Sequence, residues 1–354
     1  NFPEPTEYPT VDIFDPAVLK ISQSLMVETG QSLIERLLDE WPDLLCDARI
    51  GWGTGRGRIM NSAGIDQAYE QTSYYCSLGA QLIRGTDMLN IWTGSSSSHV
   101  LDENELDRLL QTVRRSLRWS ENIAKATPST GDIPVIFTPR GFAATLLHPL
   151  LSGFNGKNVV NESSPLCERW GEKIVDEHIS VYDNPLIGGA SGSRPFDDEG
   201  VASSKTALIE NGIAGQPLLD LQTAGQLGKL STGAAGRGLA TTPSPTSSVI
   251  DVAAGDTHFE DMIAGIKEGL IVEELLGAGQ GNELGGDFRA NVSLGYRITN
   301  GEIVGRVKDT MVSGNVYSVL SQVEYIGDSP EWIFGSLRSP AIQCRGVEVA
   351  TKSE

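Results

Sequence analysis

Few side chains in this sequence could do metal or acid–base chemistry at neutral pH. The 354 residues include four His, at positions 99, 148, 178 and 258, and the nearest two are separated by 178 − 148 = 30 residues. A helical zinc motif of the His-Glu-x-x-His type needs two imidazoles one turn apart, so that both point at the same ion. The spacing of the histidines therefore predicts no zinc site of this type.

Nucleotide-binding and serine-nucleophile motifs also fail on their spacing. Gly228-Lys229 is followed by Leu230, whereas a phosphate-binding loop has Ser or Thr there. The glycine-rich residues 277–281 lack the strand-to-helix context of a dinucleotide fingerprint. Residues 189–193 lack the last Gly of a Gly-x-Ser-x-Gly nucleophile elbow. The sequence therefore gives no support for phosphate binding or for serine catalysis.

An acidic cluster is the remaining candidate for chemistry. Asp197, Asp198 and Glu199 follow Arg194 closely. Neighbouring carboxylates can hold a hard cation or transfer a proton. The interpretation that we favour is a charged turn in which Arg194 neutralises part of the cluster. His148, in an apolar segment, is interpreted as a packed histidine. Site chemistry alone thus indicates a binding or structural subunit.

The composition excludes several classes of protein. With 46 acidic and 27 basic residues the net charge is −19, which repels phosphate backbones, so we expect neither nucleic acid nor an anionic membrane surface as a partner. No segment has the roughly 18 apolar residues of a membrane span, and the first ten residues do not resemble a secretory signal. Four widely spaced cysteines without a Cys-x-x-Cys fit reduced thiols, and we expect a cytoplasmic protein.

The hydrophobic pattern predicts an α+β fold. In the first part, residues 15–41 are predicted as one long helix and residues 48–92 as an antiparallel sheet with a turn at 61–64. A second helix begins after Asp102, with Glu105 completing a capping box, and ends near residue 126. Residues 127–131 have the composition of a linker. We therefore predict an N-terminal domain at 1–127, an antiparallel sheet with two long helices, and a second domain at 131–354.

The second domain is predicted to be mostly antiparallel β-structure with a few helices. Asn300-Gly301 lies between two apolar segments, 292–299 and 302–307, and is the strongest hairpin signal of the chain. Thr257 and Glu260 have the spacing of a capping box. Residues 140–151 are predicted as a helix that Pro149 stops or kinks, because proline lacks the backbone N–H.

Separated motifs in the second domain resemble those of the TldD/PmbA family, also known as modulators of DNA gyrase. Together they extend over nearly all of residues 131–354, whereas the N-terminal part matches more weakly. Family members usually begin with a further segment, so we expect residues 1–127 to be an incomplete version of that part. The motifs, in chain order, are Pro-Val-Ile-Phe-Thr-Pro-Arg-Gly at 134–141, Ser-Arg-Pro-Phe-Asp-Asp-Glu-Gly at 193–200, Leu-Ile-Glu-Asn-Gly at 208–212, Leu-Gly-Ala-Gly at 276–279, Gly-Asp-Phe at 286–288 and Ser-Gly-Asn at 313–315.

The resemblance implies a lost zinc site. TldD-like members carry a His-Glu-x-x-x-His helix and a later Cys as zinc ligands, whereas PmbA-like members, also called TldE, lack these ligands and pair with TldD. Here His148 matches the first His, but Pro149 replaces the Glu and Gly153 the second His, and residues 327–338 contain no Cys. One imidazole cannot hold a catalytic zinc ion, which needs three protein ligands, and no Glu remains to take a proton from water. The resemblance thus implies the PmbA/TldE branch, with no cofactor in this chain and zinc only in a TldD-like partner.

The function implied by the resemblance is that of a non-catalytic subunit of a TldD/TldE-type protease that degrades or matures unfolded peptides. Two alternatives stay open: a homodimeric hydrolase that uses the acidic cluster with His148, and a non-enzymatic protein that acts on gyrase. Extended peptide would be held by backbone hydrogen bonds, and glycines allow a backbone to approach closely. We therefore expect residues 227–248 and 277–287, including Gly279 and Asp287, to line a peptide cavity; Arg194 and the acidic cluster are further candidates for such a site.

Overall fold

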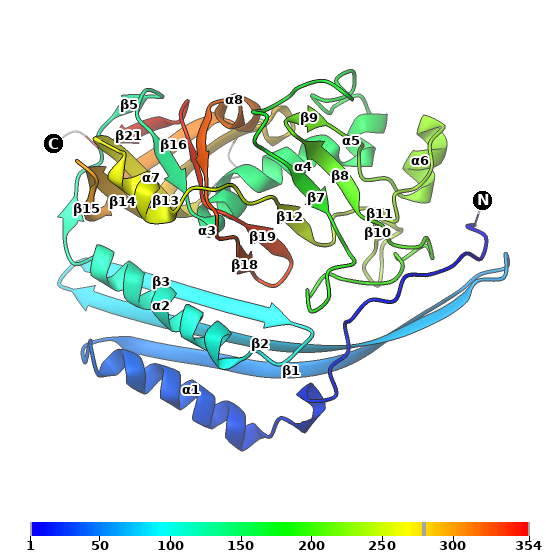
Figure 1. Cartoon of the computed structure of the whole chain (residues 1–354), viewed down its shortest axis with the longest axis horizontal. Helices are drawn as coiled ribbons and strands as arrows, with labels where there is room; N and C mark the ends of the chain where they lie inside the picture. Colours follow the sequence, from blue (N-terminus) through cyan, green and yellow to red (C-terminus); the bar gives the residue numbers. More distant parts are fainter. Residues whose placement is uncertain (1, 278–280, 353–354) are drawn as a thin grey trace.

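The first part of the chain forms a long three-stranded antiparallel sheet (Figure 1). The computed structural model describes residues 2–277 and 281–352. The register of the first two strands runs without a break from Leu45–Gln81 to Met60–Asp66, and the side chain of Asn61 accepts hydrogen bonds within the turn between them. The predicted sheet and its turn are therefore confirmed. Its strands are β1 (Leu45–Met60), β2 (Asp66–Arg84) and β3 (Asp87–Ser97).

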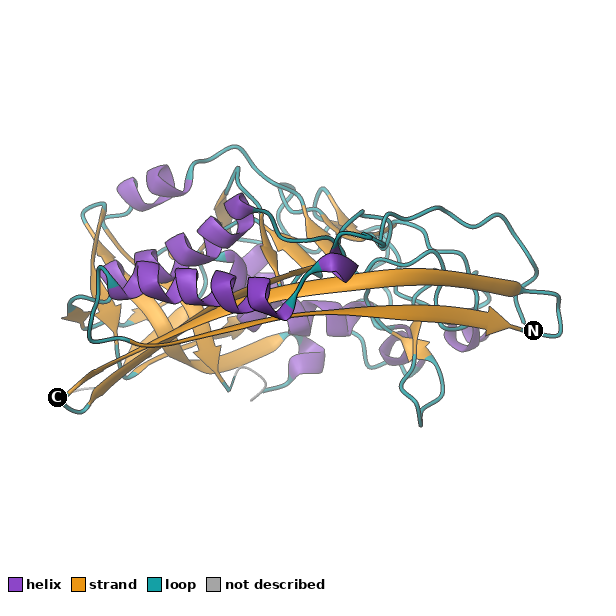
Figure 2. Cartoon of the chain, turned by 90° about the horizontal axis from the view of Figure 1, so that it is seen from below, coloured by secondary structure: helices purple, strands orange, loops and turns teal. Residues whose placement is uncertain are grey.

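Two helices cover one face of this sheet. Alternate residues of β2, such as Cys76 and Leu78, are buried, because successive side chains of a strand point to opposite faces. The buried face receives α1 (Gln23–Leu38) and α2 (Glu103–Trp119), which lie side by side, while the strands run on beyond them (Figure 2). No described helix is long and apolar enough to cross a membrane.

The predicted boundaries of both helices need correction. The expected single helix at 15–41 is divided, because Ser22 caps a new helix by accepting the backbone N–H of Leu25, and only a short 3₁₀ turn, η1 (Val18–Lys20), precedes it. The capping box of Asp102 and Glu105 is confirmed. That helix ends seven residues before residue 126, and the chain then forms a short strand.

The rest of the chain forms two larger sheets, so the predicted α+β class is confirmed. One has the order β17-β20-β6-β13-β14-β16-β21-β5, with β15 paired to β14 and β4 paired to β15, and the other has the order β18-β19-β12-β7-β8-β9. The hairpin at Asn300-Gly301 is present between β14 and β15. The strands are β4 (Ile123–Ala124), β5 (Ser129–Thr130), β6 (Val135–Phe137), β7 (Val181–Asp183), β8 (Thr206–Glu210), β9 (Ile213–Ala214), β10 (Ala235–Gly236), β11 (Ser244–Pro245), β12 (Ile250–Val252), β13 (Glu268–Leu276), β14 (Asp287–Thr299), β15 (Glu302–Val307), β16 (Thr310–Asn315), β17 (Val323–Ile326), β18 (Glu331–Ile333), β19 (Leu337–Ser339), β20 (Ile342–Cys344) and β21 (Glu348–Thr351).

The segment with Pro149 is helical throughout, so the predicted stop is wrong, whereas the predicted kink stays a prediction. It consists of α3 (Pro139–Phe142), a wide π turn η2 (Ala143–Leu147) and α4 (His148–Phe154), which follow one another directly. A proline lacks the N–H and crowds the carbonyl four residues earlier, and a π turn relieves this by shifting the bonding pattern by one residue. We call residues 139–154 the motif helix.

The other helices are short. Thr257 and Glu260 do not form the predicted capping box: α7 begins after His258, which makes no side-chain capping bond. The remaining helical segments are α5 (Gly156–Val160), α6 (Leu221–Leu227), α7 (Phe259–Ala264), η3 (Glu283–Gly285) and α8 (Val316–Leu320).

The N-terminal layer and the larger of the two C-terminal sheets share one hydrophobic core. Buried residues of α1, α2 and the first sheet pack in one cluster with Ile271, Tyr296 and Ile298 from the larger sheet. An ion pair at the edge of this contact joins Asp87 to Arg306 at 2.6 Å. The division of the chain at residues 127–131 stays a prediction.

Candidate functional site

His148 lies on the surface of the motif helix. Its side chain is 76% exposed, and its Nδ1 atom is 3.4 Å from a carboxylate oxygen of Glu283 in η3. The interpretation as a packed histidine is therefore wrong: α4 turns its buried face, with Leu150 and Phe154, toward the core and leaves His148 in solvent.

Gly153, at the place of the second His of the motif, is closely packed. A Cβ atom at this position would overlap the hydroxyl oxygen of Tyr317 and lie 3.3 Å from Leu166. Burial raises the pKa of the Tyr317 phenol, and its oxygen has no hydrogen-bond partner among the described residues. A histidine at residue 153 would therefore require Tyr317 to move.

The chemistry of the donors around the motif helix does not fit zinc. His148 and Glu283 are two possible ligands, where a catalytic site needs three. Cys344 is fully buried in β20, and burial raises the pKa of its thiol. Within residues 2–277 and 281–352, no group of three or more His, Cys, Asp or Glu side chains could hold a metal ion.

The acidic cluster lies in a buried turn, residues 194–200, which we call the acidic turn. Asp197 is 1% exposed. One of its oxygens accepts the backbone N–H groups of Glu199 (3.0 Å) and Val201 (2.9 Å), and the other accepts that of Ala235 in β10 (2.9 Å). Burial raises the pKa of Asp197, although these three bonds and the charge of Arg194 oppose the shift. Asp197 thus holds the backbone of two segments together.

The other two carboxylates of the acidic turn bond to separate parts of the chain. Asp198 accepts the backbone N–H of Arg237 at 2.8 Å, and Glu199 accepts that of Leu221, at the start of α6, at 2.7 Å. Burial is also the largest cause that raises the pKa of Glu199. The structure therefore does not bring this cluster together with His148, whose neighbour is Glu283.

Arg194 does not neutralise the acidic turn as directly as expected. Two nitrogens of its guanidinium, Nε and Nη2, are buried without a hydrogen-bond partner in the part of the chain that the structure describes. Burial raises the pKa of Asp183 and of Asp197, and the charge of Arg194 opposes this shift without reversing it. The turn is anchored instead by Phe196, whose ring meets Tyr69 of β2 edge to face at 5.2 Å.

The two loops predicted to line a peptide cavity differ in their surroundings. Gly279 lies outside the described residues. Asp287 begins β14, and its carboxylate accepts the amide of Asn315 at 2.8 Å. Residues 227–248 contain the small pair of strands β10 and β11, and Leu239, in the loop between them, is fully exposed. Their role as a cavity lining stays a prediction.

A groove that sequence reasoning missed lies between α2, β3 and the β18–β19 hairpin. It has a volume of about 410 Å³, and four arginines line it: Arg108, Arg115, Arg118 and Arg140. We call it the arginine groove. A signal was present in the sequence, since residues 114–118 contain three arginines in a chain of net charge −19. Only the fold places Arg140 and the hairpin opposite them.

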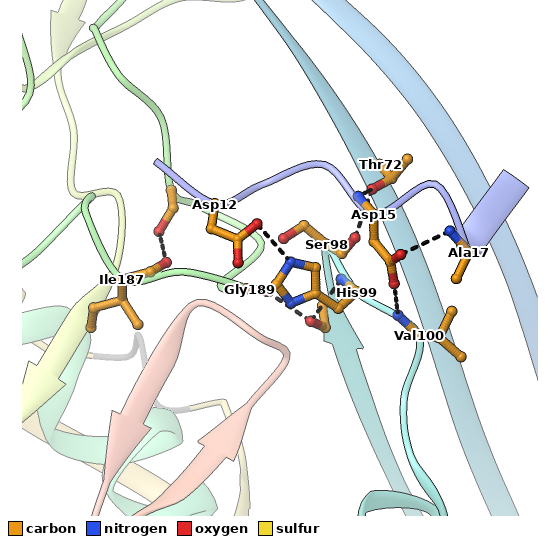
Figure 3. Close-up of polar contacts among 11 residues, drawn as sticks. Asp12, Asp15, Ala17, Thr72, Ser98, His99, Val100, Ile187 and Gly189 are labelled. Carbon is orange, nitrogen blue, oxygen red and sulfur yellow. Dashed lines mark hydrogen bonds and ion pairs between the residues drawn. The ribbon is translucent and has the colours of Figure 1, made fainter. Parts of the chain in front are cut away.

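Beside this groove, the end of β3 is tied to two segments that are distant in the sequence (Figure 3). Ser97 Oγ and Ser98 N–H both donate to the carbonyl of Gly189 at 2.8 Å. The N–H of Gly189 donates to the carbonyl of Asp12, whose carboxylate is 3.1 Å from His99. The extended N-terminal segment is thereby fixed across the end of β3 and the loop around residue 189.

Asp15 anchors the same N-terminal segment a few residues later. Its carboxylate accepts the backbone N–H groups of Ala17 and Val100 (Figure 3). The bond from Ala17 is the largest cause that holds the pKa of Asp15 below its ordinary value, and burial opposes it. A second hollow of about 350 Å³, lined by Ser97 and His99 here, shares Arg108 with the arginine groove.

Comparison with known proteins identifies a family and a solved structure with a similar fold. Residues 130–351 match the model of the PmbA/TldA metallopeptidase C-terminal domain. Over its whole length the fold is similar to TldE from Thermococcus kodakarensis, with a TM-score of 0.85 and 25% identity, covering 99% of this chain and 79% of that one.

Sequence comparison also finds related proteins. The protein MJ0231 of Methanocaldococcus jannaschii is 26% identical over 94% of this chain and 76% of its own length. The metalloprotease MJ0996 of the same organism is 31% identical over 66% of this chain, and the metalloprotease PmbA of Escherichia coli O157:H7 is 30% identical over 57%. This chain spans only 51% and 42% of the length of those two metalloproteases. The chain belongs to the PmbA/TldD family of metallopeptidase-like proteins.

Proposed function

We propose that this chain is a PmbA/TldE-like subunit that performs no hydrolysis by itself and acts in the cytoplasm with a TldD-like zinc metallopeptidase on unfolded peptides. The observation that carries the proposal is the donor set of the motif helix. His148 is exposed with Glu283 as its neighbour, Pro149 replaces the general base, and Gly153 is packed against Tyr317. Zinc would therefore be held by the partner subunit.

In such a complex this chain would supply surface and cavity walls. A rigid subunit can fix the helix and the loops of an active partner by burying one of its faces. The glycine-rich residues 227–248 and 277–287 would face the peptide, because a backbone without side chains admits another backbone closely. The backbone bonds of Asp197 would keep the first of these loops in place, since they hold β10.

A homodimeric hydrolase that uses the acidic turn is the weaker alternative. Each of Asp197, Asp198 and Glu199 accepts backbone N–H groups, so all three carboxylates are already engaged in hydrogen bonds that hold the chain together. A gyrase-binding protein is the other alternative, and the net charge of −19 makes direct contact with DNA a poor mechanism for it.

The test is to measure zinc content and peptidase activity of the purified chain, alone and after mixing with a TldD-like protein. We expect no stoichiometric zinc and no cleavage of an unfolded substrate such as casein by the chain alone, and cleavage after mixing. Chelator-sensitive cleavage by the chain alone would overturn the proposal. As controls, replacing the general-base Glu of the partner should abolish cleavage by the mixture, and His148→Ala in this chain should leave it unchanged.

A further inference from the structure

The arginine groove is a cationic site in an acidic protein. Its walls carry Arg108, Arg115 and Arg118 from α2 and Arg140 from α3, against two acidic residues, Glu105 and Glu331. Among the lining residues the arginines exceed the glutamates by 4 − 2 = 2, although Glu274 pairs with Arg140 and Glu40 pairs with Arg118 from outside the lining, and the whole chain has a net charge of −19. An anionic ligand is drawn to such a local field.

Three of these guanidinium groups keep hydrogen-bonding capacity for a ligand. Arg115 lies 3.7 Å from Glu273 and 4.0 Å from Glu331, which are loose contacts, and its Nε has no partner among the described residues. Arg108 and Arg118 have side chains that are 62% and 61% exposed, and each uses one terminal nitrogen in an ion pair, with Glu105 at 4.0 Å and with Glu40 at 3.2 Å. A guanidinium offers five N–H donors in a planar fork that matches a carboxylate, so these side chains can turn toward a bound anion.

Arg140 has a different role, because its guanidinium is already paired with a carboxylate of the chain. It forms an ion pair with Glu274 and donates to the carbonyl of Trp92, and its guanidinium lies 5.2 Å from the Trp92 ring. It thus fixes the motif helix to β3 and holds the inner wall of the groove.

Aromatic rings line the rest of the groove. Trp332 and Phe334 come from the β18–β19 hairpin, and Trp119 lies at the end of α2, on the side of the arginines. Phe334 lies at the tip of the β18–β19 hairpin and stacks on Trp92, with ring centroids 5.3 Å apart and planes at 20°.

The backbone at Phe334 is strained. Its φ is +51°, a conformation that bulky side chains rarely adopt, and such strain is often found at binding sites. The next residue, Gly335, has φ +72° and lies so close to the carbonyl of Ser96 that a Cβ atom would overlap it. The hairpin is therefore held firmly against β3, with the Phe334 ring at the groove.

We propose that the arginine groove binds a carboxylate attached to an aromatic or apolar side chain, as at the C-terminus of a peptide. Arg108, Arg115 and Arg118 would hold the carboxylate, and Trp332 and Phe334 would contact the side chain next to it. A volume of about 410 Å³ is in the range of small-molecule sites and fits one or two residues. The choice of a peptide rests on the proposed function, whereas the preference for a carboxylate rests on the groove alone.

The test uses the isolated chain and three fluorescein-labelled peptides: an Ala-Ala-Phe peptide with a free C-terminus, its C-terminal amide, and the amide with Glu before Phe. Fluorescence anisotropy at low salt should show binding of the free acid at least about tenfold tighter than that of the plain amide, since a charged fork adds strong hydrogen bonds. Binding of the Glu peptide as well would assign side-chain carboxylates to the same site. Equal affinity for the free acid and the plain amide would overturn the proposal.

Matched variants locate the site. Arg108→Gln/Arg118→Gln removes two exposed charges from the groove, and Arg49→Gln/Arg56→Gln removes two exposed charges from β1. The first pair should weaken binding of the free acid at least about tenfold and the second by less than about twofold, because the charge of the whole chain changes equally. An equal effect of both pairs would contradict a site in the groove. Because no partner subunit is used, this result is independent of whether the chain supports a TldD-like protease.

Discussion

The motif helix and the acidic turn use their polar side chains in opposite ways. In the motif helix His148, at the place of a zinc ligand of the family motif, is exposed and has one loose carboxylate neighbour. In the acidic turn Asp197 is buried and accepts three backbone N–H groups. Both segments look like sites of chemistry in the sequence. The difference teaches that the partners of a side chain decide between structural and chemical roles, and that the carboxylates of the acidic turn hold separate segments of the fold together.

The largest expected effect is on stability when the carboxylate of the acidic turn is removed. In Asp197→Ala three backbone N–H groups lose their acceptor in a buried place, so we expect the free energy of unfolding to fall by about 3 kcal/mol. Urea denaturation followed by circular dichroism measures this. The matched change in the motif helix, His148→Ala, should alter it by less than about 0.5 kcal/mol, because His148 is exposed. Equal effects of the two variants would show that the contrast between the segments is wrong.

The next effect concerns the buried side of the motif helix. Gly153→Ala should lower the free energy of unfolding by about 2 kcal/mol, because the new methyl group overlaps the Tyr317 hydroxyl. Tyr317→Phe should be close to neutral, since that hydroxyl is buried and has no partner among the described residues.

The double variant separates this clash from other causes. Gly153→Ala/Tyr317→Phe should regain at least about 1 kcal/mol relative to the sum of the single variants, because the two residues are in contact. Denaturation curves of the four proteins complete the cycle. Additive effects would mean that the hydroxyl is not what excludes a side chain, and the structural reason for Gly at this position would have to be abandoned.

The sequence predicts those local features, such as helix caps and tight turns, that residues close together in the chain determine. The capping box of Asp102 and Glu105 and the hairpin at Asn300-Gly301 are each specified within a few residues, and both are present. The same pattern at Thr257 and Glu260 fails, because His258 takes the capping position. Local patterns thus predict element types well and their ends less well.

Burial and groove formation could not be predicted, because they depend on distant partners. The buried carboxylate of Asp197 accepts the backbone N–H of Ala235, 38 residues away. His148 lies beside Glu283, which is 135 residues away (283 − 148). The arginine groove needs α2 and the β18–β19 hairpin, from opposite parts of the chain. A sequence pattern shows the arginines but not the aromatic wall that faces them.

The smallest expected effect is a difference in pH dependence between two kinds of carboxyl group. Burial raises the pKa of Asp197, so its contribution to stability is full below its ordinary pKa and is lost as the pH rises through the raised value. Glu268 is the reverse case: hydrogen bonds from Arg297 are the largest cause that lowers its pKa, so its contribution is present above its ordinary pKa and is lost as the pH falls.

Unfolding measured from about pH 4 to about pH 7 should therefore give slopes of opposite sign for the two groups. Relative to Asp197→Asn, the wild-type protein should lose stability as the pH rises, because the amide stays neutral while the buried carboxyl ionises. Relative to Glu268→Gln, it should gain stability only at the acidic end of this range, as the pH rises to the ordinary pKa of a Glu, and the two profiles should then run parallel. If the wild type and Asp197→Asn had parallel profiles, the acidic turn would hold its carboxylate as easily as solvent does. The three N–H donors and the charge of Arg194 would then balance burial, and Asp197 would ionise as it does in solvent while keeping its structural role.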